Sequence, residues 1–357
     1  MRIALLHPFS WPEVRRGGER YAHDLAWWLT SQGHDVDFVT VGATDTTEYA
    51  AGSRIVKLAP RPTSMADRRG LTGLDGFGRT VLPWLSSHRY DVVHSLATSA
   101  TVAAVKAKQR VVYSVIGHPG PLRKKIRRPD RKLLDRACHA ANVVTALSAS
   151  AASETTAMTG VPARVVQPGV RLDVFSPNLR ARRGRPELLF AADVEDRRKR
   201  LSVMLDAMPM VLKSVPQARL VIAGPGVLPD DVDPAVRAAM DTPGVGTFAD
   251  VSERFRRAHV TVLPSVDEAF GLVLVESLAC GTPVVGARSG GLPEIVVPAV
   301  GNLAEPDDAA SLAVAIIETV ALAENPATPA VCATHAARWS WDVVGPQHLD
   351  AYDAAIA

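Results

Sequence analysis

Cysteine is scarce in this 357-residue sequence, which contains only Cys138, Cys280 and Cys332. An odd number of widely spaced cysteines forms neither a disulfide framework nor the paired-cysteine pattern of a zinc site. Long apolar runs are missing as well. The longest stretch without Lys, Arg, Asp or Glu, 137–153, contains His139 and is too polar for a membrane helix, which needs roughly 20 apolar residues. The sequence therefore predicts neither a disulfide-stabilised nor a membrane-spanning protein.

An excess of charge of one sign is also missing, because 40 Lys and Arg residues face 37 Asp and Glu residues and leave a net charge of +3. An excess this small does not indicate a nucleic-acid partner. The N-terminal residues MRIALLHP contain a four-residue apolar run, which is shorter than the roughly 7–15-residue core of a signal peptide. Together with the few cysteines, these features predict a cytoplasmic protein.

Short β-branched runs alternate with segments of helical length along most of the chain, which is typical of an α/β fold with parallel sheets. In the first half we expect strands at 2–7, 36–40, 54–58, 91–95, 110–115 and 142–147. In the second half we expect strands at 187–192, 219–223, 244–248, 259–263 and 283–286. Residues 176–186, rich in Pro and Arg, have the composition of a linker.

The length and the two strand series predict two domains, at a prior of about 150 residues per domain. We place an N-terminal Rossmann-like domain at 1–170 and a C-terminal Rossmann-like domain at 171–340. The last segment, 341–357, has apolar residues at near-helical spacing and is expected to form a terminal helix that begins near Pro346.

The most informative segment is 264–295, PSVDEAFGLVLVESLACGTPVVGARSGGLPEI. Glu268 lies in a polar turn after a predicted buried strand, and Glu276 lies eight residues later inside the following helix. Two carboxylates so placed can face one pocket. The alternative is that Glu268 is a helix-start charge and Glu276 a surface residue, although Glu276 has mostly apolar neighbours.

Between the two glutamates, backbone N–H groups at the start of a helix have no partner within the helix. With the helix dipole they form a site for a phosphate or another anion, and glycine allows a ligand to approach closely. The residues that supply these groups are Phe270, Gly271 and Leu272.

The sequence EAFGLVLVE from Glu268 to Glu276 resembles the EX7E motif of the retaining glycosyltransferases of family 4. Cys280-Gly-Thr-Pro-Val and Gly290-Gly-Leu-Pro-Glu294 are similar to the usual continuation of that motif. The resemblance implies a GT-B fold, with two Rossmann-like domains that face a cleft and a nucleotide sugar held mainly by the C-terminal domain. It also implies that the helix at 341–357 crosses back to pack on the N-terminal domain.

Two segments of the first half resemble donor-binding parts of the same family. Gly17 and Gly18, in the sequence RGGER, are similar to a first loop whose backbone N–H groups approach the donor diphosphate; an ordinary turn is the alternative. His118 follows a predicted strand, where the family carries a histidine that reaches the transferred sugar. Because α/β sheets bind ligands at the carboxyl ends of their strands, this position favours a functional histidine over a structural one.

The basic run 197–200, RRKR, resembles the pair of cations that binds the donor diphosphate in this family. The resemblance assigns that role to Arg198 and Lys199, and the alternative is a solvated basic turn. The sequence departs from the family at Asp193, where an arginine is usual. Since an aspartate repels a diphosphate, we expect Asp193 to point away from it or to contact a neighbouring arginine.

Residues 121–136 carry eight Lys or Arg against two Asp, a local charge of +6. They are expected to be a solvated basic surface, an interfacial segment for anionic lipid at the inner membrane face, or a site for an anionic acceptor, and Pro129 interrupts any single helix.

Asp35 and Asp37 mimic a metal-binding DxD pair, but they flank the start of a predicted strand and are expected to face solvent. GxSxG, HExxH and Walker motifs are absent, so hydrolase, zinc-enzyme and ATPase functions have no support.

The resemblance implies a retaining transferase that moves a hexose-type sugar from a nucleoside diphosphate sugar to an acceptor hydroxyl, without a catalytic metal or another cofactor. It implies that Glu276 binds the ribose hydroxyls of the nucleotide and that Glu268 contacts the donor sugar. It also implies that His118 contacts the same sugar from the other domain. Two alternatives stay open, a nucleotide-sugar epimerase of the same fold and a non-catalytic sugar-nucleotide-binding partner subunit. The acceptor candidates are a small natural product, an aminocyclitol and a lipid phosphate.

Overall fold

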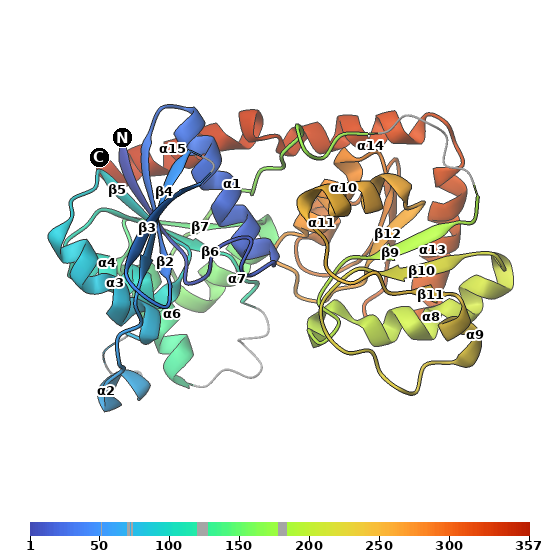
Figure 1. The fold of residues 1–357 in the computed structure, drawn as a ribbon, viewed down its shortest axis with the longest axis horizontal. Helices are drawn as coiled ribbons and strands as arrows, with labels where there is room; N and C mark the ends of the chain where they lie inside the picture. Colours follow the sequence, from blue (N-terminus) through green and yellow to red (C-terminus); the bar gives the residue numbers. More distant parts are fainter. Residues whose placement is uncertain (51, 70–71, 73, 120–127, 178–183) are drawn as a thin grey trace. The chain divides into compact units, whose positions relative to one another are not determined.

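The computed structural model describes residues 1–50, 52–69, 72, 74–119, 128–177 and 184–357. The chain divides into two compact units, of which unit 1 comprises Met1–Gly169 with Trp341–Ala357 and unit 2 comprises Val170–Ser340. Each unit contains a mainly parallel sheet with helices packed on it (Figure 1). The predicted α/β fold class is confirmed.

The sheet of unit 1 has, within the described ranges, eight strands in the order β3-β4-β2-β1-β5-β6-β7-β8. They are β1 (Arg2–Leu6), β2 (Asp35–Val41), β3 (Thr46–Ala50), β4 (Ser53–Leu58), β5 (Val92–Ser95), β6 (Val111–Val115), β7 (Val143–Ala146) and β8 (Arg164–Val165). β3 runs antiparallel to β4 at the edge, whereas β1 pairs in parallel with β2 and β5. The central strands are apolar because helices cover both faces of the sheet.

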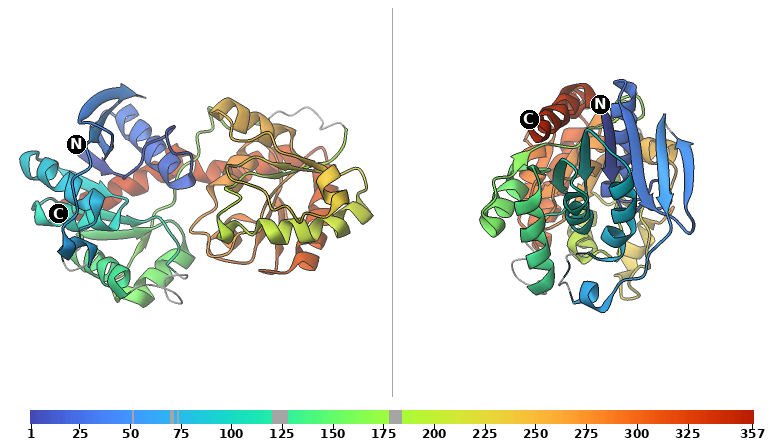
Figure 2. Two further views of the ribbon diagram at one scale, coloured as in Figure 1. Left: turned by 60° about the horizontal axis from the view of Figure 1, so that its bottom comes forward. Right: turned by 90° about the vertical axis from the view of Figure 1, so that its left-hand side faces the viewer.

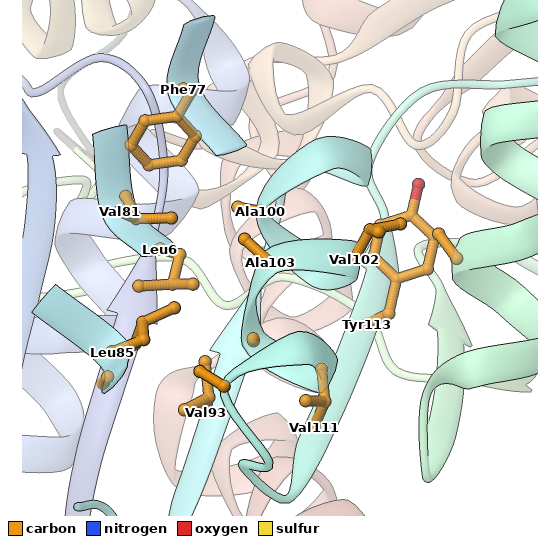
Figure 3. Close-up of a cluster of buried hydrophobic side chains, with 14 of the residues drawn as sticks. Leu6, Phe77, Val81, Leu85, Val93, Ala100, Val102, Ala103, Val111 and Tyr113 are labelled. Atoms are coloured by element: carbon orange, nitrogen blue, oxygen red, sulfur yellow. The ribbon is translucent and has the colours of Figure 1, made fainter. Parts of the chain in front are cut away.

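Seven helices of unit 1 fall in the described part of the chain: α1 (Gly17–Ser31), α2 (Met65–Arg68), α3 (Gly76–Ser87), α4 (Thr98–Lys106), α6 (Arg128–Ala140), α7 (Ala149–Thr159) and α15 (Trp341–Ile356). α3, α4 and α6 contribute to one hydrophobic core with the sheet. In Figure 3, Val81 and Leu85 of α3 lie beside Leu6 and Val93 of the strands, and the small Ala103 lies on the neighbouring helix α4.

α15 returns to unit 1 and packs beside α1 (Figures 1 and 2). Trp341 stacks on Tyr21 with ring centroids 6.4 Å apart and on Trp28 at 6.0 Å. An added Cβ on Gly345 would lie 2.2 Å from the Trp28 ring, so glycine is required for this approach. The predicted start near Pro346 is wrong, because this aromatic packing fixes Trp341 as the first helical residue and leaves the proline inside the helix.

A buried polar cluster joins α15 to the sheet and to α1. His348 Nε2 lies 3.0 Å from the hydroxyl of Tyr21, and His94 Nδ1 lies 2.8 Å from the hydroxyl of Tyr352. His94 Nε2 lies 2.6 Å from Ser114 Oγ. Both histidines are 1% exposed, so the helix is held by hydrogen bonds as well as by apolar contacts.

The sheet of unit 2 has six described strands in the order β11-β10-β9-β12-β13-β14. The strands are β9 (Glu187–Phe190), β10 (Arg219–Ile222), β11 (Met240–Asp241), β12 (Val260–Leu263), β13 (Val284–Ala287) and β14 (Gly301–Ala304). The helices are η1 (Arg197–Lys199), α8 (Leu201–Ser214), α9 (Pro234–Ala238), α10 (Phe248–Arg257), α11 (Leu272–Ala279), α12 (Leu292–Ile295), α13 (Ala309–Ala323), α14 (Thr328–Ala336) and η2 (Ala337–Trp339). α8 and α13 lie side by side over the core of the sheet.

One expected strand and one expectation about exposure differ from the structure, and some edge strands were missed. The predicted strand at 244–248 is wrong: Thr247 and Asp250 form a capping box that starts α10 instead. The edge strands β3 and β14 lack long apolar runs and were not expected. Asp37 does not face solvent, because its carboxylate is buried against Arg54 and accepts a hydrogen bond from the Tyr90 hydroxyl at 2.6 Å.

Two expected segments fall partly outside the described residues. Of the expected linker at 176–186, residues 178–183 lie outside them, and the chain passes between the units at Gly169 and Val170. Of the basic segment, residues 121–127 lie outside them, so its contact with lipid or acceptor stays a prediction.

In the described ranges, no single helix is both long and apolar enough to cross a membrane. Taken together, α13 and the segment Thr328–Trp339 are long and apolar enough, but the chain bends by 109° between them.

Candidate functional site

Two loops of unit 2 follow neighbouring strands and bring the predicted cationic and acidic residues together. η1 follows β9, the Glu268 loop follows β12, and these strands pair in parallel. Lys199 Nζ donates a hydrogen bond to Glu268 Oε2 at 2.6 Å, and the two side chains are 19% and 17% exposed. The N–H of Val266 donates to the carbonyl of Arg198 at 2.9 Å, which joins the loops through their backbones.

A third loop, at 288–291, is hydrogen-bonded to the backbone of the Glu268 loop. The Gly291 N–H donates to the Glu268 carbonyl at 2.8 Å, and the Asp267 N–H donates to Ser289 Oγ at 3.0 Å. Gly290 has a φ of +58°, and an added Cβ there would lie 2.2 Å from the Glu268 carbonyl oxygen. The sequence showed this glycine pair as part of the motif but gave no sign of its contact with Glu268.

The start of α11 presents backbone donors beside these loops. Gly271 has a φ of +106° and caps the helix, and an added Cβ would lie 2.5 Å from the Leu292 side chain. Leu274 N–H donates to the Gly271 carbonyl at 2.9 Å, whereas the N–H groups of Gly271, Leu272 and Val273 meet no acceptor among the described residues. Such groups and the helix dipole favour an anion.

The side chain of Phe270 is structural. It is 2% exposed, and its ring packs edge-on against Trp339 with centroids 6.1 Å apart. Any contact of Phe270 with a ligand is therefore made by its backbone.

Glu276 lies in the second turn of α11 and is 2% exposed. The alternative of a surface residue is therefore wrong. A carboxylate held this deep in a helix of Leu, Val and Ala is a candidate for a binding site.

Arg198 is turned toward a carboxylate that the sequence did not single out. Its Nε and a terminal guanidinium nitrogen donate to the two oxygens of Asp196, at 3.2 and 2.7 Å, and the Arg198 N–H donates to the same carboxylate at 3.0 Å. Burial alone would lower the pKa of Arg198, but the hydrogen bonds and charge of Asp196 outweigh it and raise that pKa. The signal that could have revealed Asp196 is an aspartate directly before a run of basic residues, where it can cap their turn.

Asp193 forms a local turn. Its Oδ1 accepts a hydrogen bond from the Glu195 N–H at 2.9 Å. The neighbouring Gly224 fixes this segment, because an added Cβ would lie 1.7 Å from the Ala192 carbonyl oxygen.

The three predicted site residues of unit 1 lie at the carboxyl edge of its sheet. An added Cβ on Gly18 would lie 3.2 Å from Ile116 Cδ1 and 3.7 Å from His7 Nε2, whereas Gly17 has nothing within 4 Å. His118 Nε2 lies 3.0 Å from Ser150 Oγ, near the start of α7. Gly17 and Gly18 are the first two residues of α1, not part of a loop, and the structure places this helix start beside the loop that follows β6.

Family models match most of the chain. The model described as Glycosyltransferase Family 4 matches residues 15–174. The model described as Glycosyl transferases group 1 matches residues 185–321, which include the Lys199–Glu268 contact.

Curated relatives have related descriptions. A phosphatidyl-myo-inositol mannosyltransferase of Propionibacterium freudenreichii is 26% identical over 99% of this chain and 95% of the relative. A D-inositol 3-phosphate glycosyltransferase of Nocardiopsis dassonvillei is 36% identical over 54% of this chain. That alignment spans about half, 50%, of the relative.

Solved structures share the fold. Sucrose-phosphate synthase from Thermosynechococcus elongatus superposes with a TM-score of 0.79 at 22% identity, over 99% of this chain and 98% of that one. HepE from Anabaena, solved in complex with UDP-glucose, superposes with a TM-score of 0.74 at 17% identity, over 99% and 100% of the two chains. The GT-B fold expected from the EX7E resemblance is confirmed.

Proposed function

We propose that this chain, which belongs to glycosyltransferase family 4, transfers a hexose-type sugar from a nucleoside diphosphate sugar to an acceptor hydroxyl, with retention of configuration and without a catalytic metal. Its activity as a glycosyltransferase follows from the family. The donor, the stereochemistry and the independence of metal are the parts that we propose.

The observation that carries the proposal is the contact between Lys199 and Glu268 beside the start of α11. Cations and free N–H groups stabilise the negative charge that develops on a departing diphosphate, and they are most effective when already oriented. Lys199, Arg198 and the donors of Gly271 and Leu272 supply these groups. Glu268 supplies the opposite charge, which suits the positive charge that develops at the anomeric carbon.

The proposed step conserves atoms and charge. The bond between the anomeric carbon and the phosphate oxygen breaks, and the acceptor oxygen bonds to the same face of that carbon. The acceptor proton passes to the departing phosphate oxygen. Glu276 binds the ribose hydroxyls, since a carboxylate accepts hydrogen bonds from two hydroxyls at once.

For unit 1, the proposal assigns donor contacts to Gly17, Gly18 and His118. Gly17 and Gly18 offer backbone N–H groups to the diphosphate, and His118 binds a hydroxyl of the transferred sugar. For the acceptor, the names of the relatives suggest inositol phosphates and phosphatidylinositol as the first compounds to test.

The test measures thermal shift and calorimetric binding with UDP-, GDP-, ADP- and dTDP-sugars. A ligand that binds only the folded state raises the unfolding free energy by about 2.7 kcal/mol at a hundred times its Kd. Glu276→Ala should weaken binding of the selected donor by about 10- to 100-fold, since hydrogen bonds to charged groups contribute about 1.5–3 kcal/mol. Glu318→Ala, an exposed glutamate inside α13, is the matched control and should bind as the wild type does.

Incubation of the purified chain with the selected donor separates the functions. Transfer to an inositol-type acceptor supports the proposal. Conversion of the donor to its epimer without an acceptor, or donor binding without any turnover, would replace it with an epimerase or a non-catalytic subunit. An absence of binding to every donor would contradict it.

A further inference from the structure

Arg200, directly after Lys199, has a backbone conformation that is unusual for a residue with a side chain. Its φ and ψ are +56° and +42°, in the left-handed region, where it ends η1 and caps α8. Left-handed geometry is unfavourable for every residue except glycine and, to a lesser degree, Asn and Asp. Contacts elsewhere in the structure therefore offset this cost.

The Arg200 guanidinium is held at both ends. Its Nε donates to Asp307 Oδ1 at 2.5 Å and a terminal nitrogen donates to Asp307 Oδ2 at 3.3 Å. The other terminal nitrogen donates to the Arg197 carbonyl at 2.7 Å, so the side chain folds back over the turn that it follows. Asp307, in the loop between β14 and α13, also has a left-handed φ of +59°.

Other contacts anchor the parts of unit 2 on both sides of this residue. Before it, the Lys199 N–H donates to the Asp196 carbonyl at 2.8 Å, and the Arg198 carbonyl accepts from Val266. After it, α8 packs against α13 in the hydrophobic core. Because α8 is held by the core, the left-handed turn at Arg200 sets, together with the Val266 contact, the direction of η1 and the position of Lys199.

We propose that the Arg200–Asp307 pair is a positioning device for Lys199: it holds the left-handed turn that directs Lys199 Nζ to Glu268. The inference rests on the proposed function, because it assigns Lys199 to the donor diphosphate. Arg200 and Asp307 are positioning residues and do not touch the donor in this scheme.

If Arg200 and Asp307 formed only a surface ion pair between the start of α8 and the β14–α13 loop, loss of the pair would leave ligand binding unchanged. The Arg200 and Asp307 side chains are 29% and 56% exposed, and exposed pairs add little to the stability of the fold. Loss of the pair should therefore change ligand binding more than the melting temperature. Glycine adopts left-handed geometry without help, so Arg200→Gly should make Asp307 dispensable.

The experiment measures calorimetric affinity of the full chain for UDP, GDP and ADP, and then uses the tightest binder. Asp307→Ala and Arg200→Ala should each weaken binding about tenfold, because the left-handed turn is no longer stabilised. The double variant with Asp307→Ala and Arg200→Gly should return to within about threefold of the wild type. Glu305 lies in the same loop as Asp307 and forms an exposed ion pair with Arg288. Glu305→Ala removes this pair and should leave both affinity and melting temperature unchanged.

Lys199→Ala is the reference variant. If it weakens binding while Asp307→Ala and Arg200→Ala bind as the wild type does, the positioning role is wrong and the proposed function stands. If the glycine variant fails to rescue Asp307→Ala, the charge rather than the turn matters, and the inference is overturned. If no nucleoside diphosphate binds, or Lys199→Ala has no effect, the proposed function fails and the inference fails with it. If Arg200→Ala does not fold, the comparison of Asp307→Ala with the double variant of Asp307→Ala and Arg200→Gly decides the question alone.

Discussion

Lys199 and Glu268 neutralise each other in unit 2, with Nζ and Oε2 2.6 Å apart. A diphosphate that binds Lys199 therefore competes with Glu268 for the same ammonium group. In the proposed function, binding of the donor would release the carboxylate to act on the sugar, which would couple the two roles.

Glu268→Gln should separate these roles. The variant should bind the nucleoside diphosphate as tightly as the wild type or up to about tenfold more tightly, because the competing charge is gone. Sugar transfer should fall by about 100-fold, the scale seen when one electrostatic group is removed from an active site. Calorimetry and initial rates measure both quantities, and weaker diphosphate binding would contradict the competition.

Gly290→Ala should disrupt the Glu268 loop. The new Cβ would lie 2.2 Å from the Glu268 carbonyl oxygen, and the left-handed backbone adds a cost of about 1–3 kcal/mol. Chemical denaturation should show this loss together with weaker donor binding. Gly76→Ala, at the first residue of α3 with nothing within 4 Å, is the matched control, and an equal effect of both changes would argue against the contact.

Gly345→Ala should weaken the packing of α15 against α1. Its Cβ would lie 2.2 Å from the Trp28 ring, and overpacking of this kind costs about 1–3 kcal/mol. The free energy of unfolding and the fluorescence of the buried tryptophans measure the effect. Gln347→Ala, on the exposed side of the same helix, should leave both unchanged.

His94 and His348 should make the stability of the protein depend on pH. Burial lowers the pKa of His348 to about 4 and holds the pKa of His94 well below its usual value, with the nearby charge of His348 acting in the same direction. The unfolded chain takes up these protons below about pH 6.5, whereas folded His348 does so only near pH 4 and folded His94 only well below its usual range. The free energy of unfolding should therefore fall as the pH decreases across this window, by about 1.4 kcal/mol per pH unit for each histidine.

Urea denaturation at several pH values between 7.5 and 5 tests this dependence. His348→Gln should remove the contribution of one histidine from the slope. His139→Gln, on the exposed face of α6, is the control. A slope that does not change in His348→Gln would show that carboxylates, and not the buried cluster, cause the dependence.

The strands predicted correctly from the sequence are interior strands of the two sheets, and edge strands such as β3 were missed. Val92–Ser95 and Val111–Val115 are completely buried and rich in valine because both faces are covered, and such β-branched runs are visible in the sequence. β3 is exposed throughout and is polar, so it has no such signal. At 244–248 the sequence GVGTF was expected to form a strand, but the capping pair Thr247 and Asp250 decided the local structure.

The candidate site was predictable where a residue's role depends on its own chemistry. Lys199 and Glu268 were identified from the family motif, and the structure brings them together. Gly290 and Asp307 contact Glu268 and Arg200, which lie 22 and 107 residues away in sequence, and no local pattern records such contacts. Arg200 carried the opposite signal, because a left-handed turn is usually marked by glycine.

Unit 1 is built from two stretches of chain that are separated by the whole of unit 2. During synthesis the ribosome completes Val170–Ser340 before it delivers Trp341, so unit 2 can fold while unit 1 still lacks its last helix. Until then Tyr21, Trp28 and His94 have no cover from α15, and an aromatic surface is open to chaperones or to other nascent chains. Completion of the first unit therefore depends on the synthesis of Trp341–Ala357, and a ribosome that stalls before this segment would leave that surface exposed.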